Sequence, residues 1–178
     1  LPAIGYLGQR PWLTITGDSR LWAAIASVLF SYAVFVLLGY FKDRSADQAT
    51  GYRTLVVKAG WRLALGVSAA FSLAAVTASW LLLQHSGLEQ RPTGAGEAIG
   101  ALLWAGGVIS LVVAHQRIAR LGGEERRAHL GITHAVRGYI LLHLGEAVAL
   151  QPLLGGPALL YALFFEIALQ RRPERGQI

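Results

Sequence analysis

Long apolar runs separated by short polar stretches dominate the chain. The runs cover residues 21–41, 61–84, 95–114 and 130–150, and a shorter one covers 158–169. A helix needs roughly 20 apolar residues to cross about 30 Å of hydrocarbon, so the first four runs are long enough and the fifth is short. The pattern predicts four membrane-spanning helices, followed by a segment that either spans or lies at the interface.

Local signals agree with these limits. Asp18-Ser19 is a typical helix N-cap ahead of the first run, and Gly122-Gly123 interrupts a helical continuation of the third run. Small residues inside the runs let helices approach closely. The clearest are Gly66, Ser68, Ala69, Ala70 and Ser72 in the second run, and Ala105-Gly106-Gly107 in the third.

The composition fits this interpretation, since the chain is 54% hydrophobic and only 15% charged. We therefore expect an all-α, polytopic transmembrane helix bundle, with residues 1–178 forming one transmembrane domain. The absence of cysteine excludes disulfides and zinc sites built on thiolates. Methionine is absent too, so Leu1 is not the initiator, and we expect the C-terminal portion of a longer protein.

Basic residues gather in alternate polar stretches, which predicts the orientation in the membrane. Stretches 42–62, 117–127 and 171–175 hold nearly all of them, and the other side keeps Arg10, Arg20 and Arg91. The positive-inside rule places the basic side in the cytoplasm, in an inner or plasma membrane. The net charge of +6 therefore reflects topology, and no nucleic-acid partner is expected.

A charge-dense stretch at residues 39–55 follows the first run and holds the candidate chemistry. Asp43 and Asp47 share one helical face if the helix continues past Tyr40. Paired carboxylates suit magnesium, which usually keeps waters and a substrate phosphate as its other ligands. The cations beside them, suited to phosphate oxygens, are Lys42, Arg44 and Arg53. The pattern indicates a lipid-diphosphate site at the membrane edge.

The stretch Tyr40-x-Lys42-Asp43-x-x-x-Asp47-x-x-x-Gly51-x-Arg53-Thr54-Leu55-x-Val57-x-x-Gly60 resembles the second aspartate-rich motif of the UbiA superfamily of intramembrane prenyltransferases. The resemblance implies a bundle of about nine transmembrane helices, of which this chain holds four to five. It also implies magnesium-dependent transfer of a prenyl group from a polyprenyl diphosphate to an acceptor, often an aromatic one.

The resemblance assigns roles to individual residues. Asp43 and Asp47 would be the catalytic residues and the magnesium ligands, and Lys42 and Arg53 would contact the diphosphate. Further substrate-binding candidates are Tyr40 and Arg137. Each has a simpler interpretation: the carboxylates as solvated partners of neighbouring cations, the cations as anchors at the membrane edge, Tyr40 as an interfacial aromatic, and Arg137 as a side chain that snorkels to the interface.

The chain departs from the family pattern at three points. Tyr40 stands where many members have an aspartate, and Val56 stands where they have a proline. The first motif, N-x-x-x-D-x-x-x-D, is absent from these residues. We therefore expect missing N-terminal helices to carry it, and the present chain to be inactive alone.

Ionisable residues inside the runs are functional candidates because they are costly in hydrocarbon. We expect Glu146 to be satisfied by a neighbouring helix, and we interpret His134 and His143 as packed or interfacial residues. Glu166 either faces a cavity or marks an interfacial helix.

Two other classes remain as alternatives. A CDP-alcohol phosphotransferase also uses aspartates at a membrane edge, but its pattern needs an Asp-Gly pair, which this sequence lacks. A non-catalytic membrane protein, such as a transporter half or an assembly factor, would use the acidic stretch only as a contact surface. Magnesium-dependent binding of a prenyl diphosphate separates that class from the enzyme.

Overall fold

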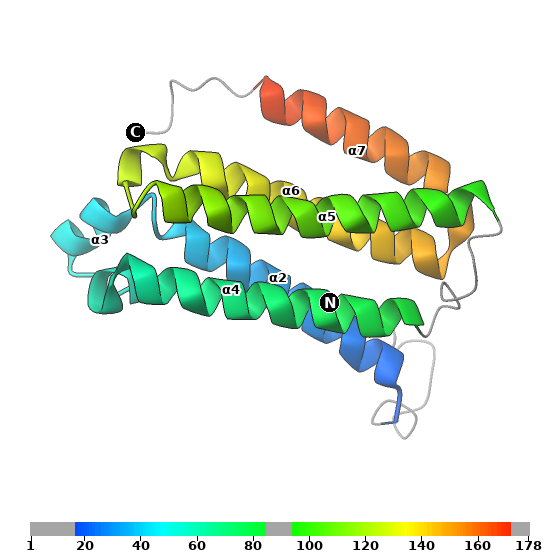
Figure 1. Cartoon of the computed structure of the whole chain (residues 1–178), viewed down its shortest axis with the longest axis horizontal. Helices are drawn as coiled ribbons and strands as arrows, with labels where there is room; N and C mark the ends of the chain where they lie inside the picture. The colour runs from blue at the N-terminus through cyan, green and yellow to red at the C-terminus, as the bar shows by residue number, and fades with distance from the viewer. Residues whose placement is uncertain (1–16, 85–93, 172–178) are drawn as a thin grey trace.

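The computed structural model describes residues 17–84 and 94–171, and within these ranges every regular element is helical (Figure 1). The elements are α2 (Ser19–Gly39), α3 (Arg44–Thr50), α4 (Leu55–Gln84), α5 (Ala95–Arg120), the short 3-10 turn η2 (Glu125–Arg127), α6 (His129–Leu150), a second 3-10 turn η3 (Pro152–Leu154), and α7 (Gly155–Gln170). The predicted all-α bundle is confirmed. The expected polar connection at residues 85–93 lies outside the described residues.

Among the described residues, four helical segments are long and apolar enough to cross a membrane, so the chain is an integral membrane protein. They are α2, α4, α5, and the segment Pro152–Gln170 formed by η3 and α7. The last segment, which the sequence left open between spanning and interfacial, meets the requirement because η3 lengthens it. α6 has the predicted length but falls outside this group, contrary to the expectation for residues 130–150. The polar residues that α6 carries dilute its hydropathy.

The helices form two pairs, with α6 at the centre. α2 packs on α4, α5 packs on α6, and α6 also contacts α2, α4 and α7 (Figure 1). The larger core cluster lies towards the α3 end and combines residues from the last turns of α2 with residues of α4, α5 and α6. Its fully buried members include Val34, Leu38, Phe41, Leu111 and Ile118. α7 buries only small residues, Gly155, Ala158 and Ala162.

Glycines bring the backbones of α5 and α6 into direct contact. A Cβ atom added at Gly107 would lie 2.6 Å from the Leu142 backbone nitrogen, and one at Gly145 would lie 2.6 Å from that of Trp104. Gly107 therefore confirms the close packing predicted for its run. Gly66 does not, because nothing lies within 4 Å of a Cβ added there. The prediction was wrong for Gly66 because that glycine does not face a neighbouring helix.

The acidic stretch and the turn between α5 and α6 lie at the same end of the bundle (Figure 1). Ser45 of α3 donates hydrogen bonds to Glu125 of η2, which joins the two segments. Most described basic residues belong to this end: Lys42, Arg44, Arg53, Lys58, Arg62, Arg117, Arg120, Arg126 and Arg127. Arg20 lies at the opposite end, and the predicted positions of Arg10, Arg91 and the tail beyond residue 171 lie outside the described residues.

The glycine interface yields a test with adjacent positions. Gly107→Ala forces a methyl group against the α6 backbone and should lower the free energy of unfolding by about 1–3 kcal/mol. Gly106→Ala is the matched control, because a Cβ there meets only the Leu141 side chain, at 3.5 Å. Thermal melting in detergent should place Gly107→Ala below both wild type and Gly106→Ala. Equal melting of the two variants would contradict the close contact.

Candidate functional site

The acidic motif lies where one helix ends and a separate short helix begins. α2 ends at Gly39, and the next residues form tight turns in which Lys42 donates its backbone N–H to the Gly39 carbonyl at 3.0 Å. The sequence interpretation assumed that this helix continues past Tyr40. The structure shows that it does not. Asp43 is instead the N-cap of α3, and its carbonyl accepts the Asp47 N–H at 2.8 Å. The two carboxylates are still one helical turn apart, but on α3.

Two glycines of the motif have backbone conformations that side chains rarely adopt. Gly51 ends α3 with a φ of 79°, and the Tyr52 N–H bonds back to the Asp47 carbonyl at 2.8 Å. Gly60 has a φ of 82° and a ψ of 163° inside α4, so the uninterrupted helix starts at Trp61, as predicted. Glycine is favoured at both positions because it has no Cβ atom to clash. The motif spacing therefore fixes the path of the chain from α3 into α4.

Two of the motif side chains have a buried oxygen atom without a hydrogen-bond partner. The Asp43 carboxylate is exposed and makes no capping hydrogen bond with α3. Asp47 is half-buried, and its Oδ2 atom is buried without a hydrogen-bond partner, as is the Oγ1 atom of Thr54. An unpaired buried oxygen is costly, so each such atom needs an explanation. A desolvated carboxylate oxygen with no partner fits the donor set of a divalent cation.

The predicted cations and Tyr40 lie on the same connection as the aspartates. Lys42 is half-buried and Arg53 is exposed. Tyr40 is half-buried and packs against the larger core cluster, which gives it a structural role. Among the described residues, no group of three or more histidine, aspartate or glutamate side chains is placed to hold a metal. This part of the chain therefore offers two carboxylates, which is less than a complete metal cage.

Arg137 is held elsewhere. Its guanidinium forms a two-point ion pair with Glu166 of α7, through Nε to Oε1 at 2.5 Å and Nη2 to Oε2 at 2.8 Å. Its Nη1 atom lies 3.0 Å from Nδ1 of His134. Glu166 thus faces a partner on α6, a pairing that the sequence analysis did not predict. No hydrogen bond or ion pair joins Arg137 to either aspartate in the described part of the chain.

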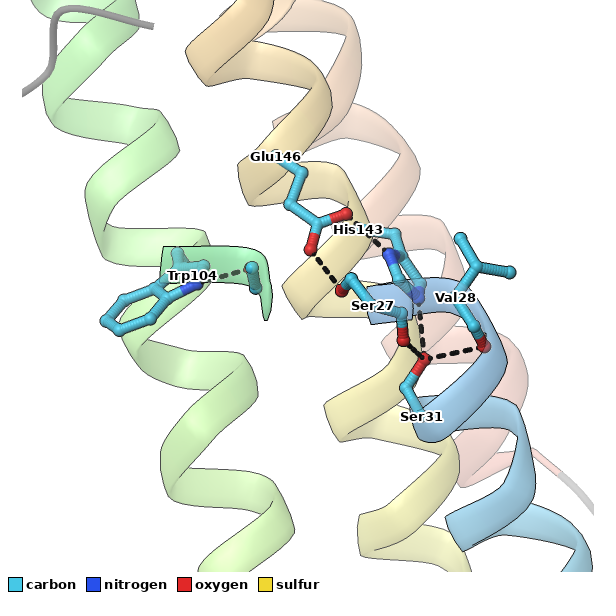
Figure 2. Close-up of polar contacts among 7 residues, drawn as sticks. Ser27, Val28, Ser31, Trp104, His143 and Glu146 are labelled. Atoms are coloured by element: carbon cyan, nitrogen blue, oxygen red, sulfur yellow. Dashed lines mark hydrogen bonds and ion pairs between the residues drawn. The ribbon is translucent and has the colours of Figure 1, made fainter. Parts of the chain in front are cut away.

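A second polar cluster lies inside the bundle between α2 and α6 (Figure 2). Ser27 donates its hydroxyl to Oε1 of Glu146 at 2.5 Å, and Oε2 of Glu146 lies 2.7 Å from Nδ1 of His143. Nε2 of His143 lies 2.9 Å from the Ser31 hydroxyl. Both serines and Glu146 are buried. The expectation that a neighbouring helix satisfies Glu146 is confirmed, and Ser27 is the residue that does so.

The order Ser31, His143, Glu146 resembles the hydroxyl–imidazole–carboxylate series of hydrolytic enzymes. The surroundings argue against that use. The Ser31 side chain is only 1% exposed, and its hydroxyl donates to the Ser27 carbonyl at 2.6 Å, so its proton already has an acceptor. A cavity of about 420 Å³ borders His143, but Ser31 does not line it. The cluster therefore ties α2 to α6 and offers no accessible nucleophile.

The cavity beside His143 is mostly apolar. Its lining residues come from α2, α6 and α7: Val28, Tyr139, Ile140, His143, Leu144 and Tyr161. The Tyr139 and His143 rings meet edge to face, with centroids 4.7 Å apart. Both ring nitrogens of His143 are engaged in the cluster, so the cavity presents aromatic and aliphatic walls and few polar groups.

Sequence reasoning missed the serines because it considered only ionisable residues. Ser27 and Ser31 are four positions apart on α2, and His143 and Glu146 are three apart on α6. Both spacings place side chains on one helical face, which is the signal that could have paired them. A similar pair, Ser68 of α4 and His115 of α5 at 3.0 Å, escaped for the same reason.

Comparisons with known proteins found no matching family model, no matching curated protein and no matching solved structure. The resemblance to the UbiA superfamily therefore depends on the motif residues alone.

The buried cluster yields a prediction about stability. Ser27→Ala leaves an oxygen of Glu146 without its donor in the apolar interior, so the free energy of unfolding should fall by about 1 kcal/mol. Ser72→Ala is the matched control, because the Ser72 hydroxyl is buried without a partner and its loss should be neutral or stabilising. Thermal melting of both variants in detergent checks this. Unchanged melting of Ser27→Ala would show that the bond contributes nothing.

Proposed function

We propose that this chain carries one half of the diphosphate site of an intramembrane prenyltransferase similar to the UbiA superfamily. The reaction is magnesium-dependent transfer of a prenyl group from a polyprenyl diphosphate to an acceptor, often an aromatic one. One observation carries the proposal. Asp43 and Asp47 lie one turn apart just beyond the end of a membrane-spanning helix. The Asp43 side chain makes no capping hydrogen bond, and the Oδ2 atom of Asp47 is buried without a hydrogen-bond partner.

The position of the motif suits an amphiphilic substrate. A polyprenyl diphosphate needs a charged site for its head and an apolar path for its tail. α2 leads directly into the acidic stretch, and Val34 and Leu38 of α2 and Phe41, just after its end, are buried before it. In this proposal the diphosphate binds beside α3, and the tail lies among the spanning helices. In this proposal the site lies on the cytoplasmic face, which the basic residues at this end support through the positive-inside rule.

Each motif residue has a role that follows from its charge. Asp43 and Asp47 hold the magnesium ion through carboxylate oxygens, and Lys42 and Arg53 approach the diphosphate oxygens. Bound magnesium supplies positive charge where the leaving diphosphate gains negative charge. Fixed cations in a site that excludes water stabilise that charge more than they would in bulk solvent. The short α3, closed by Gly51, keeps both carboxylates on one rigid element.

The proposal leaves two points about the site: where the remaining metal ligands come from, and whether Arg137 takes part. The remaining ligands belong, in this proposal, to a first aspartate-rich motif on helices upstream of this chain. Arg137 is not assigned a diphosphate contact, because Glu166 already accepts two hydrogen bonds from its guanidinium.

The test is binding of a prenyl diphosphate to the complete protein, since it needs no knowledge of the acceptor. Asp43→Ala and Asp47→Ala should each weaken magnesium-dependent binding of geranylgeranyl diphosphate by at least about a hundredfold, because each removes a charged metal ligand. Gln48→Ala, at an exposed position of the same short helix, is the control and should bind as wild type. Wild-type affinity in both aspartate variants, with melting temperatures unchanged, rejects the proposed function.

A further inference from the structure

Asp43 occupies the N-cap position of α3 but does not cap it. An aspartate at this position normally accepts the backbone N–H of the second or third helical residue. Asp18, at the N-cap of α2, behaves in this way: its Oδ1 atom accepts the N–H groups of Arg20 and Leu21 at 3.0 and 3.2 Å. The Asp43 side chain makes no such bond. An aspartate at the N-cap thus caps its helix in α2 but not in α3.

A carboxylate from a distant segment takes the place of Asp43. Glu125 of η2, 80 positions away in the sequence, accepts the N–H of Ser45, the second residue of α3, with both its oxygens at 3.2 Å. Its Oε1 atom also accepts the Ser45 hydroxyl at 2.5 Å. Glu125 therefore supplies the cap that Asp43 would otherwise supply. Ser45 lies between the two aspartates of the motif, so the cap is made within the proposed metal site itself.

We propose that Glu125 is a positioning residue of the diphosphate site. By taking the donors of Ser45, it leaves the Asp43 carboxylate available for a cation. Without Glu125, we expect the Asp43 side chain to accept the Ser45 N–H, as the Asp18 side chain accepts the N–H of Arg20 at the equivalent position of α2. This inference rests on the proposed function, since it explains how one of its two metal ligands stays uncommitted.

Glu125 acts through α3 and is not itself a third ligand in this inference. Its two oxygens already accept the Ser45 donors, and no trio of metal-binding side chains forms among residues 17–84 and 94–171. The distinction can be tested, because a capping role needs only a hydrogen-bond acceptor, whereas a ligand role needs the negative charge.

The experiment measures the affinity of the complete protein for Mn²⁺ by electron paramagnetic resonance, without substrate, so that activity is not the readout. Glu125→Ala removes the cap and should weaken Mn²⁺ binding by about tenfold, as expected for loss of a group that orients a metal ligand. Glu125→Gln keeps a carbonyl acceptor for Ser45 and should bind within about threefold of wild type by the same reasoning.

Glu124→Ala is the matched control. It removes the same charge from the adjacent position, where the side chain forms only an exposed pair with Arg127 at 3.9 Å, and it should leave Mn²⁺ binding unchanged. Ser45→Ala removes the hydroxyl bond but keeps the backbone donor, so it should weaken binding less than Glu125→Ala. This variant keeps the test decisive if Glu125→Ala folds poorly.

The outcomes separate the two proposals. Retained Mn²⁺ binding in Asp43→Ala and Asp47→Ala overturns the proposed function itself. Loss of binding in those variants, with wild-type affinity in both Glu125→Ala and Ser45→Ala, overturns only the positioning role. A Glu125→Gln variant as weak as Glu125→Ala also overturns it, because the negative charge would then be what matters.

Discussion

Polar groups on α6 must find their partners inside the bundle, because the hydrocarbon around it offers none. Glu146 is satisfied by Ser27 of α2, and Arg137 is satisfied by Glu166 of α7. Each contact needs a neighbouring helix at a defined height and rotation. The requirement explains why the helix with the most ionisable side chains lies at the centre, and why α2 and α7 pack against it where they do.

The same constraint reaches the acidic motif through α2. Ser31 contacts His143 of α6, and the end of α2 at Gly39 lies about 12 Å further along the helix axis. The polar cluster therefore sets the height at which the acidic stretch leaves the bundle. A second attachment, from Ser45 to Glu125, fixes the short helix itself. α6 and the turn that precedes it thus hold the motif at two levels, one in the apolar interior and one at the edge.

Much of the fold could be predicted from the sequence because the signals are local. The apolar runs set the helices, Asp18 caps α2, and the helix of residues 61–84 starts after Gly60. The end of α2 could not be predicted, because tertiary burial decides it. Phe41 is 1% exposed in the main core cluster together with Val56, so the chain turns to bury it and leaves the helical path. No local sequence pattern predicts the turn that follows Gly39.

Partners of buried side chains were also beyond the sequence, since they depend on how helices are rotated relative to one another. Arg137 was a diphosphate candidate by charge alone, and the sequence did not indicate that Glu166 of the neighbouring α7 would pair with it. Asp43 shows the opposite case. A carboxylate oxygen cannot cap a helix and bind a cation with the same lone pairs, so its use depends on whether another acceptor is near. Asp18 caps its helix and Asp43 does not. The difference is that Glu125, far away in the sequence, already accepts the Ser45 N–H. A motif can therefore name the residues suited to a metal, but the tertiary contacts determine which of their oxygen atoms are left to bind it.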